Sequence, residues 1–168
     1  MIEILKVQEI VREAAKIFSN RNAAEQIKQK GVFDYVTAID EAVQEFIQKE
    51  LSDLYPQIQF MGEEKDNSDI DMSGQVWVLD PVDGTTNLIH DYQNSAISLA
   101  LIDNSEIILG IIYNPFSDEM FYAEKDKGSF LNGKRIYVSD AEQMKDSLIS
   151  VGTSPYFKEE AEQNFMRF

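Results

Sequence analysis

The sequence predicts an α+β fold in which two N-terminal helices pack on an antiparallel β-sheet. Apolar residues recur every three or four positions in the first 54 residues, which is the period of a helix. Short β-branched or aromatic segments follow from residue 58 onward. Turn residues separate these segments by connections too short for a parallel crossover, so neighbouring strands are expected to be antiparallel.

The two helices are expected over residues 1–30 and from Thr37 to Pro56. Whether residues 20–30 continue the first helix is left open by the pattern. The second helix has a clearer start, because Thr37 is a capping residue type and Asp40 follows three positions later, close to a capping box. Pro56 ends it, since proline cannot continue a helix. The expected strands are 58–61, 75–80, 95–103, 107–113 and 119–125.

Composition limits the possible functions. The 168 residues include 15 Lys and Arg against 30 Asp and Glu, a formal net charge of −15. This acidity disfavours non-specific binding to nucleic acid or to an anionic membrane. The absence of cysteine excludes disulfides and thiolate metal sites, and the single His90 excludes a site with two imidazoles. With a charged N-terminal segment in place of a signal peptide, the sequence predicts a single-domain cytoplasmic protein over residues 1–168.

Acidic residues outnumber basic ones between residues 62 and 83, and two short motifs stand out there. Gly62-Glu63-Glu64 follows one expected strand, and residues 79–87 (LDPVDGTTN) follow the next. In the second motif Pro81 keeps the preceding aspartate extended, and Gly84 permits a positive φ. The threonines and asparagine after Gly84 favour a helix start, whose free N–H groups attract an anion.

Carboxylates beside an anion site require cations, and Mg²⁺ prefers oxygen ligands and binds phosphate. The motifs therefore favour a metal-dependent phosphoester hydrolase, with a solvated acidic loop as the plainer alternative. A second alternative is a non-catalytic calcium-binding module over residues 69–80, in which Asp69, Asp71 and Ser73 match an EF-hand loop. Against an EF-hand, loop position 12 is Asp80 where Glu is usual, and the flanking segments lack a helical pattern.

The segment 77–87 (WVLDPVDGTTN) resembles the signature of the inositol monophosphatase family, the magnesium-dependent, lithium-sensitive sugar-phosphate phosphatases. Gly62-Glu63-Glu64 is similar to the family's GEE motif, and residues 34–40 (DYVTAID) are similar to its DxVTxxD motif. The resemblance implies a layered α-β-α-β-α sandwich, of which residues 1–168 would form the first half. It also implies phosphate monoester hydrolysis by a metal-activated water.

The resemblance assigns metal ligands. It implies that Glu63, Asp80 and the backbone carbonyl of Val82 hold a first Mg²⁺, and that Asp80 and Asp83 hold a second. Family sites contain two or three Mg²⁺ ions, and lithium is expected to inhibit. The family's chains continue past residue 168 and supply a further aspartate to the second site, so we expect that site to be incomplete here, with low or absent activity. We also expect an exposed apolar sheet face where the family's second half would lie.

The resemblance also assigns catalytic and substrate-binding roles. Glu63 and the Thr85 hydroxyl would orient and deprotonate the water, and Asp40 would accept a hydrogen bond from Thr85. For Asp40, the helix cap and the catalytic role are compatible, and both stay open. The substrate phosphate would contact the N–H groups of Gly84 and Thr85. The expected substrate-binding residues are Glu63, Val82, Asp83, Gly84, Thr85 and Thr86.

The substrate class is a small phosphorylated metabolite, with myo-inositol 1-phosphate as the first expectation. Adenosine 3′,5′-bisphosphate and fructose 1,6-bisphosphate phosphatases of the same family share these metal residues, so they stay as alternatives. The expected assembly is a homodimer. The roles of Glu64, Lys28 and Lys30 are left open. His90 is expected at the surface or in packing, and Trp77 in the core.

Overall fold

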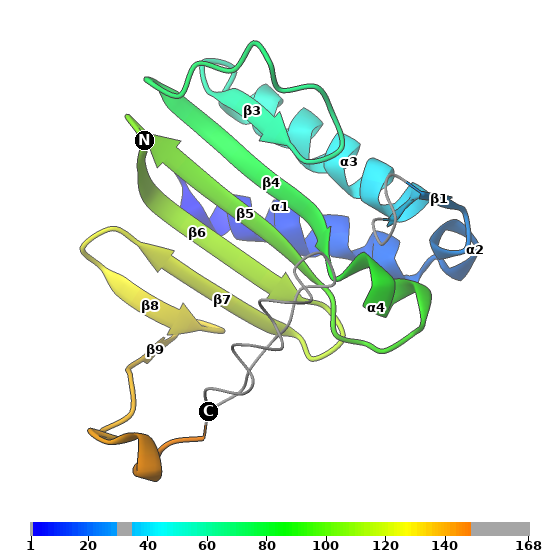
Figure 1. Cartoon of the computed structure of the whole chain (residues 1–168). Helices are drawn as coiled ribbons and strands as arrows, with labels where there is room; N and C mark the ends of the chain where they lie inside the picture. Colours follow the sequence, from blue (N-terminus) through cyan, green and yellow to red (C-terminus); the bar gives the residue numbers. More distant parts are fainter. Residues whose placement is uncertain (1, 30–34, 149–168) are drawn as a thin grey trace, which may run out of the picture.

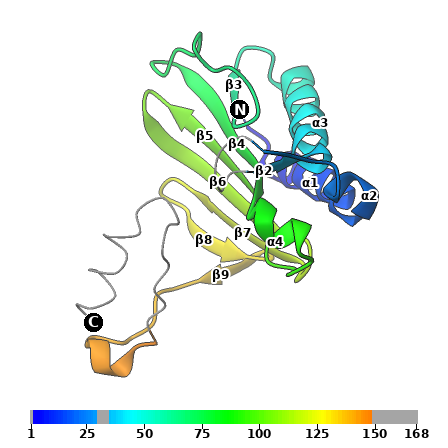
Figure 2. The ribbon, with the colours of Figure 1, turned by 45° about the vertical axis from the view of Figure 1, so that its right-hand side comes forward.

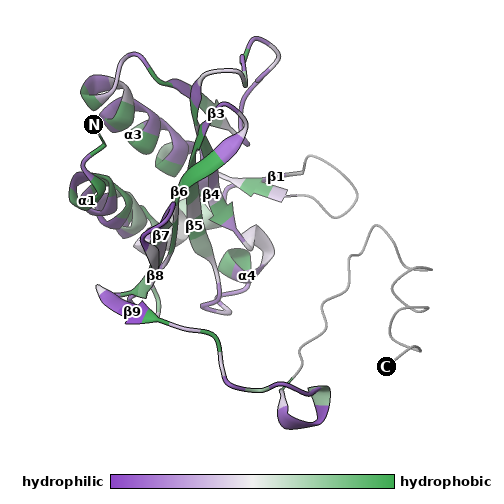
Figure 3. Cartoon of the chain, turned by 90° about the vertical axis from the view of Figure 1, so that its left-hand side faces the viewer, coloured by the Kyte–Doolittle hydropathy of each residue, from purple (hydrophilic) through white to green (hydrophobic). Residues whose placement is uncertain are grey.

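The computed structural model describes residues 2–29 and 35–148. One layer of helices packs against one face of a seven-stranded sheet, as Figures 1 and 3 show. The α+β expectation is therefore confirmed. The strands follow one another across the sheet in chain order: β3 Gln59–Gly62, β4 Gln75–Asp83, β5 Ala96–Asp103, β6 Glu106–Asn114, β7 Glu119–Glu124, β8 Gly128–Leu131 and β9 Lys134–Ile136.

The N-terminal helix is shorter than predicted. Helix α1 covers Ile4–Ala15 and continues as a 3₁₀ turn, η1, over Lys16–Ser19. The side chain of Asn20 then accepts a hydrogen bond from the Ala23 N–H at 3.2 Å, which starts the separate short helix α2, Arg21–Ala24. Strand β1, Ile27–Gln29, pairs antiparallel with β2, Tyr35–Thr37, so the first helix does not continue through residues 20–30, the point that the sequence pattern left open.

Helix α3, Ala38–Leu54, begins and ends where the sequence predicts. Thr37 is its N-cap, with an extended backbone and a side chain that accepts from the Ile39 N–H at 3.1 Å. Asp40 completes the capping box, and the helix ends two residues before Pro56. Its apolar stripe of Ile39, Val43, Ile47 and Leu51 is fully buried against the sheet, which anchors the helix from its first turn to its last.

One strand pairing differs from the antiparallel expectation. Strand β3 runs parallel to β4, with Gln59 opposite Val76 and Gly62 opposite Leu79. The connection over residues 63–74 is long enough for a parallel crossover, although it contains no helix. The pairings from β4 to β9 are all antiparallel, and those between β5, β6 and β7 are the ones that the short turns predict. Strands β8 and β9 were not expected from the sequence.

Strand β4 continues past Asp80, where the sequence predicts its end. The register against β5 shifts between Asp80 and Asp83, and this irregularity accommodates Pro81 inside a strand. Because Gln75–Asp83 is a strand, residues 69–80 do not have the helix–loop–helix arrangement of an EF-hand.

A single core lies between the helices and the sheet. Trp77 and Leu79 of β4 and Leu99 of β5 are at most 2% exposed and belong to the same cluster as the buried residues of α1 and α3. The expectation that Trp77 is a core residue is confirmed. In the described part of the chain, no helix combines the length and the apolar character that a membrane span needs.

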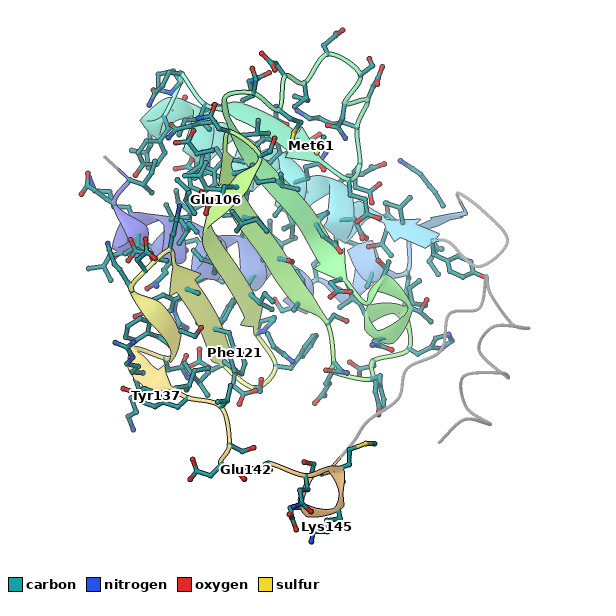
Figure 4. All side chains as sticks on the ribbon, turned by 60° about the vertical axis from the view of Figure 1, so that its left-hand side comes forward. Met61, Glu106, Phe121, Tyr137, Glu142 and Lys145 are labelled. Atoms are coloured by element: carbon teal, nitrogen blue, oxygen red, sulfur yellow. The ribbon has the colours of Figure 1, made fainter. Side chains whose placement is uncertain are left out.

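The opposite face of the sheet is apolar and uncovered between β5 and β8. We call the surface formed by Ser98, Ala100, Ile112, Phe121, Ala123 and Ser129 the bare sheet face. Ile112 is 49% exposed and Phe121 is 39% exposed, and no charged side chain lines this groove among the described residues. Figure 3 shows α1 and α3 on the other side of the sheet, and Figure 4 labels Phe121 on β7.

Exposed apolar surface of this kind promotes self-association and dye binding. We expect Phe121→Lys to lower both the binding of a hydrophobic fluorescent dye and the weight-average mass in sedimentation. Leu5→Lys is the matched control, because Leu5 is 70% exposed on α1, outside the bare sheet face. A wild-type chain that stays monomeric and binds no dye would contradict this expectation.

Candidate functional site

The parallel pairing of β3 and β4 brings Glu63 beside Asp80. Gly62 is opposite Leu79, and the next N–H along the chain, that of Glu63, donates to the Leu79 carbonyl at 3.1 Å. Glu63 therefore follows β3 at the level where Asp80 lies on β4. The Glu63 side chain is exposed and Asp80 is half-buried. Asp80 alternates along β4 with the core residue Leu79, so its side chain is on the face of the sheet opposite the core.

Asp80 interacts electrostatically with two neighbouring carboxylates. Burial is the largest of the causes that together raise the pKa of Asp80 to about 7, and the negative charges of Glu63 and Asp83 act in the same direction. The Val82 N–H opposes this shift by donating to Asp80 Oδ1 at 3.1 Å. Three acidic side chains thus lie close enough to repel one another at one end of β4.

The turn after Asp83 is built around Gly84. Gly84 has φ 90° and ψ 42°, and a Cβ there would lie 3.0 Å from the Asn94 carbonyl, so a side chain would be both strained and crowded. Ser95, which is 2% exposed, donates to the Gly84 carbonyl at 2.8 Å. Helix α4, Thr85–Ile89, begins directly afterwards, as predicted, with Thr86 exposed in its first turn.

Thr85 connects this turn to α3. Its hydroxyl lies 3.1 Å from Asp40 Oδ1 and 3.0 Å from the Val82 carbonyl, and it can donate its single proton to either. Asp40 is 2% exposed, and its other oxygen accepts from the Thr37 N–H at 2.7 Å and from the Thr37 hydroxyl at 2.6 Å. Asp40 is therefore both the helix cap and the partner of Thr85. Figure 2 shows β2, α4 and the end of β4 gathered at this end of the molecule.

The donor set suits a hard cation. Glu63, Asp80, Asp83 and the Val82 carbonyl offer only oxygen atoms, which Mg²⁺ prefers. Within the described ranges, no three acidic, histidine or cysteine side chains are close enough to form a ready-made metal cluster. Glu63 and Asp83 are both exposed, so their side chains have room to rotate toward an ion beside Asp80.

Three supporting residues were missed by the sequence analysis. Gln44 of α3 accepts from the Glu64 N–H at 2.9 Å, and Asn67 donates to the Gly62 carbonyl at 2.7 Å. Ser95 holds Gly84, as described above. The spacing of Gln44, one helical turn after Asp40, is a signal that could have identified it. Nothing in the local sequence distinguishes Asn67 or Ser95 from ordinary loop residues.

Of the residues whose roles the sequence left open, Glu64 takes part in these contacts through its N–H. Lys28 of β1 is exposed and forms an ion pair with Glu41. Lys30 lies outside the described residues. His90 is exposed at the end of α4, which agrees with the expectation of a surface or packing position.

The chain is similar to known inositol monophosphatases. An inositol monophosphatase of Dictyostelium discoideum is 42% identical over 146 residues, which cover 84% of this chain and 54% of that relative. A fructose-1,6-bisphosphatase/inositol-1-monophosphatase of Thermotoga maritima is 36% identical over 126 residues, which cover 75% of this chain and 48% of that relative. The chain therefore spans about half the length of these curated relatives.

A solved structure shows the same fold. The crystal structure of the extragenic suppressor protein suhB from Bartonella henselae superposes with a TM-score of 0.75 at 33% identity, over 82% of this chain and 55% of that chain. The profile described as the inositol monophosphatase family matches residues 2–166. Since that match covers nearly the whole sequence and includes every residue of the candidate site, the chain belongs to the inositol monophosphatase family.

Proposed function

We propose that this site serves the Mg²⁺-dependent hydrolysis of a phosphate monoester. The observation that carries the proposal is the convergence of Glu63, Asp80 and Asp83 beside the Thr85–Asp40 hydrogen bond. A bound cation would offset the repulsion between these carboxylates at the edge of the sheet. Family membership supports the same reaction class.

In this proposal Glu63, Asp80 and the Val82 carbonyl hold one Mg²⁺, and Asp80 and Asp83 hold a second. Bound Mg²⁺ would neutralise the carboxylates and the substrate phosphate, and would lower the pKa of a water molecule. The Val82 carbonyl lies 3.0 Å from the Thr85 hydroxyl, and with two lone pairs it can bind a cation whether or not Thr85 donates to it.

Thr85 and Asp40 are placed to move a proton. The Thr85 oxygen accepts a proton from the attacking water while its own proton passes along the 3.1 Å hydrogen bond to Asp40 Oδ1. Asp40 stays fixed during this transfer, because its second oxygen is held by two groups of Thr37. Glu63, on the other side of Asp80, orients the same water.

The turn at Gly84 binds the phosphate in this proposal. The N–H groups of Gly84, Thr85 and Thr86 belong to the turn and to the first turn of α4, where helical geometry provides no intrahelical acceptor. Backbone N–H groups of this kind stabilise the charge of a transferring phosphoryl group.

The substrate stays a proposal within the family. We infer myo-inositol 1-phosphate as the first candidate, with fructose 1,6-bisphosphate and adenosine 3′,5′-bisphosphate as alternatives. The name of the Thermotoga maritima relative, fructose-1,6-bisphosphatase/inositol-1-monophosphatase, includes two substrates. Fructose 1,6-bisphosphate therefore stays an alternative here. Lithium inhibition, a homodimer and a cytoplasmic location are predictions of the same proposal.

A comparison of the metal affinities of the Asp83→Asn and Asp69→Asn variants tests the proposal directly. Both aspartates are exposed, but only Asp83 lies in the proposed site, while Asp69 lies in the calcium-like loop. We expect Asp83→Asn to weaken the binding of Mn²⁺, a Mg²⁺ substitute, by about tenfold or more in calorimetric titration, and Asp69→Asn to leave it unchanged. The reverse result, binding lost only with Asp69→Asn, would refute the phosphatase site and favour a calcium-binding module.

A further inference from the structure

Gln44 is a buried polar residue that contacts the backbone on both sides of Glu63. It lies on α3, is 5% exposed, and its Oε1 accepts from the Glu64 N–H at 2.9 Å. A Cβ on Gly62 would lie 2.2 Å from the same Oε1 and 2.5 Å from the Gln44 Cδ. The Gln44 side chain therefore packs directly on the backbone of residues 62–64, and glycine at position 62 leaves room for it.

Two other contacts fix the same segment. The Glu63 N–H donates to the Leu79 carbonyl of β4 at 3.1 Å. The Asn67 side chain donates to the Gly62 carbonyl at 2.7 Å and to the Lys65 carbonyl at 3.1 Å, which closes the loop after β3. The backbone around Glu63 is thus held by β4, by α3 and by its own loop. Figure 4 labels Met61, which lies on β3 two residues before Glu63.

Helix α3 reaches two parts of the candidate site from one face. Asp40 and Gln44 are four residues apart, so their side chains project from the same side of the helix, one turn apart. Asp40 accepts from Thr85 at 3.1 Å, and Gln44 accepts from Glu64 at 2.9 Å. A single rigid element, anchored by its buried stripe, thereby sets where Thr85 and Glu63 lie relative to each other.

We propose that Gln44 is a positioning residue, which holds Glu63 where a divalent cation shared with Asp80 can bind. This inference rests on the proposed function and adds to it a residue outside the three motifs. Gln44 makes no contact with the metal in this proposal. It acts by giving the Glu64 N–H a buried acceptor, without which the loop after β3 loses its contact with α3.

The test is Mn²⁺ titration of the whole 168-residue chain by calorimetry, with folding checked by circular dichroism. Gln44→Met keeps the length and removes the acceptor, and we expect it to weaken Mn²⁺ binding about tenfold. Gln44→Glu restores an acceptor for the Glu64 N–H, and we expect Mn²⁺ affinity within about threefold of wild type.

Gln59→Met is the matched control. Gln59 is also a glutamine that braces a loop, with Nε2 donating to the Asp71 carbonyl at 2.8 Å and Oε1 accepting from the Asp71 N–H at 3.0 Å. Both of these side-chain hydrogen bonds go to Asp71 and none of them to residues 62–64, so we expect Gln59→Met to lower the melting temperature without changing Mn²⁺ affinity. Gly62→Ala is a second route to the same result, since its methyl group displaces the Gln44 side chain and should weaken Mn²⁺ binding as Gln44→Met does.

Glu63→Gln separates the two proposals. If Glu63→Gln abolishes Mn²⁺ binding while Gln44→Met and Gly62→Ala both leave it unchanged, Gln44 has only a structural role and this inference is wrong. If Glu63→Gln itself leaves Mn²⁺ binding unchanged, the proposed function is wrong and the inference about Gln44 is wrong with it. Weaker binding with Gln44→Met, recovered by Gln44→Glu, supports the inference.

Discussion

Asp80→Asn is expected to stabilise the metal-free chain near neutral pH and to abolish its stabilisation by Mg²⁺. Burial and the charges of Glu63 and Asp83 raise the pKa of Asp80 to about 7, so its ionised form is unfavourable in the folded protein. Asn removes that charge and keeps the shape. The gain is about 1–2 kcal/mol after discounting for the solvent that screens a half-buried carboxyl, or about 2–8 °C in melting temperature.

The sign of the pH dependence follows from the same shift. The folded-state pKa of about 7 lies above the ordinary aspartate value of 3.8, so the folded state binds a proton more tightly than the unfolded state. The stability from this group is fully present below about pH 4 and is lost as the pH rises through about 7. In the absence of metal, Asp80→Asn should flatten this part of the stability curve.

Thermal melts of both proteins with and without Mg²⁺ give the measurement. At a Mg²⁺ concentration of about 100 times its dissociation constant, wild type should gain about 2.7 kcal/mol, and Asp80→Asn should gain nothing measurable. Asp71→Asn is the control, because Asp71 is an exposed aspartate in the neighbouring loop. A variant that is less stable without metal and still responds to Mg²⁺ would show that Asp80 has another role.

Asp40→Ala is expected to produce the largest loss of stability among the site variants. The carboxylate accepts from the Thr37 N–H, the Thr37 hydroxyl and the Thr85 hydroxyl, and all of these contacts are buried or partly buried. Removing a charged acceptor from several donors costs about 3 kcal/mol or more, which includes the loss of the α3 cap. Glu41→Ala, one residue later and facing Lys28 at the surface, should cost about 1 kcal/mol or less.

A double-mutant cycle with Thr85→Val isolates the part of this loss that concerns the site. If the Asp40–Thr85 hydrogen bond positions Thr85, the coupling energy in urea unfolding should be about 1 kcal/mol or more. A coupling energy near zero would mean that Asp40 acts only as the cap of α3, and the proton transfer to Asp40 proposed above would lose its support.

Where local chemistry decides the structure, the sequence was sufficient. Thr37, Asp40 and Pro56 delimit α3 because capping and proline effects act within a few residues. The antiparallel order of β5, β6 and β7 follows from the short turns between them, since a short turn permits only an antiparallel partner. Gly84 adopts the positive φ that its position after Asp83 predicts.

Where contacts between distant segments decide the structure, the sequence was not sufficient to predict it. The parallel pairing of β3 with β4 depends on how residues 63–74 cross between the strands, and no local pattern encodes that crossing. The N-terminal helix ends early because Asn20 starts a new turn within a pattern whose period is otherwise helical. Gln44 accepts from the Glu64 N–H across twenty positions of sequence, so this contact becomes visible only in the folded chain. The motifs name the acidic residues of the candidate site, and the fold shows which residues contact the backbone around them.

The most direct test of the proposed metal site beside Asp80 is a crystal structure of this chain grown with Mn²⁺, with anomalous scattering to locate the metal. The account predicts an anomalous peak bound by Glu63, Asp80 and the Val82 carbonyl, with Asp83 reaching the same region. A peak held by Asp69 and Asp71 in the neighbouring loop, or no peak beside Asp80 at saturating Mn²⁺, would contradict it.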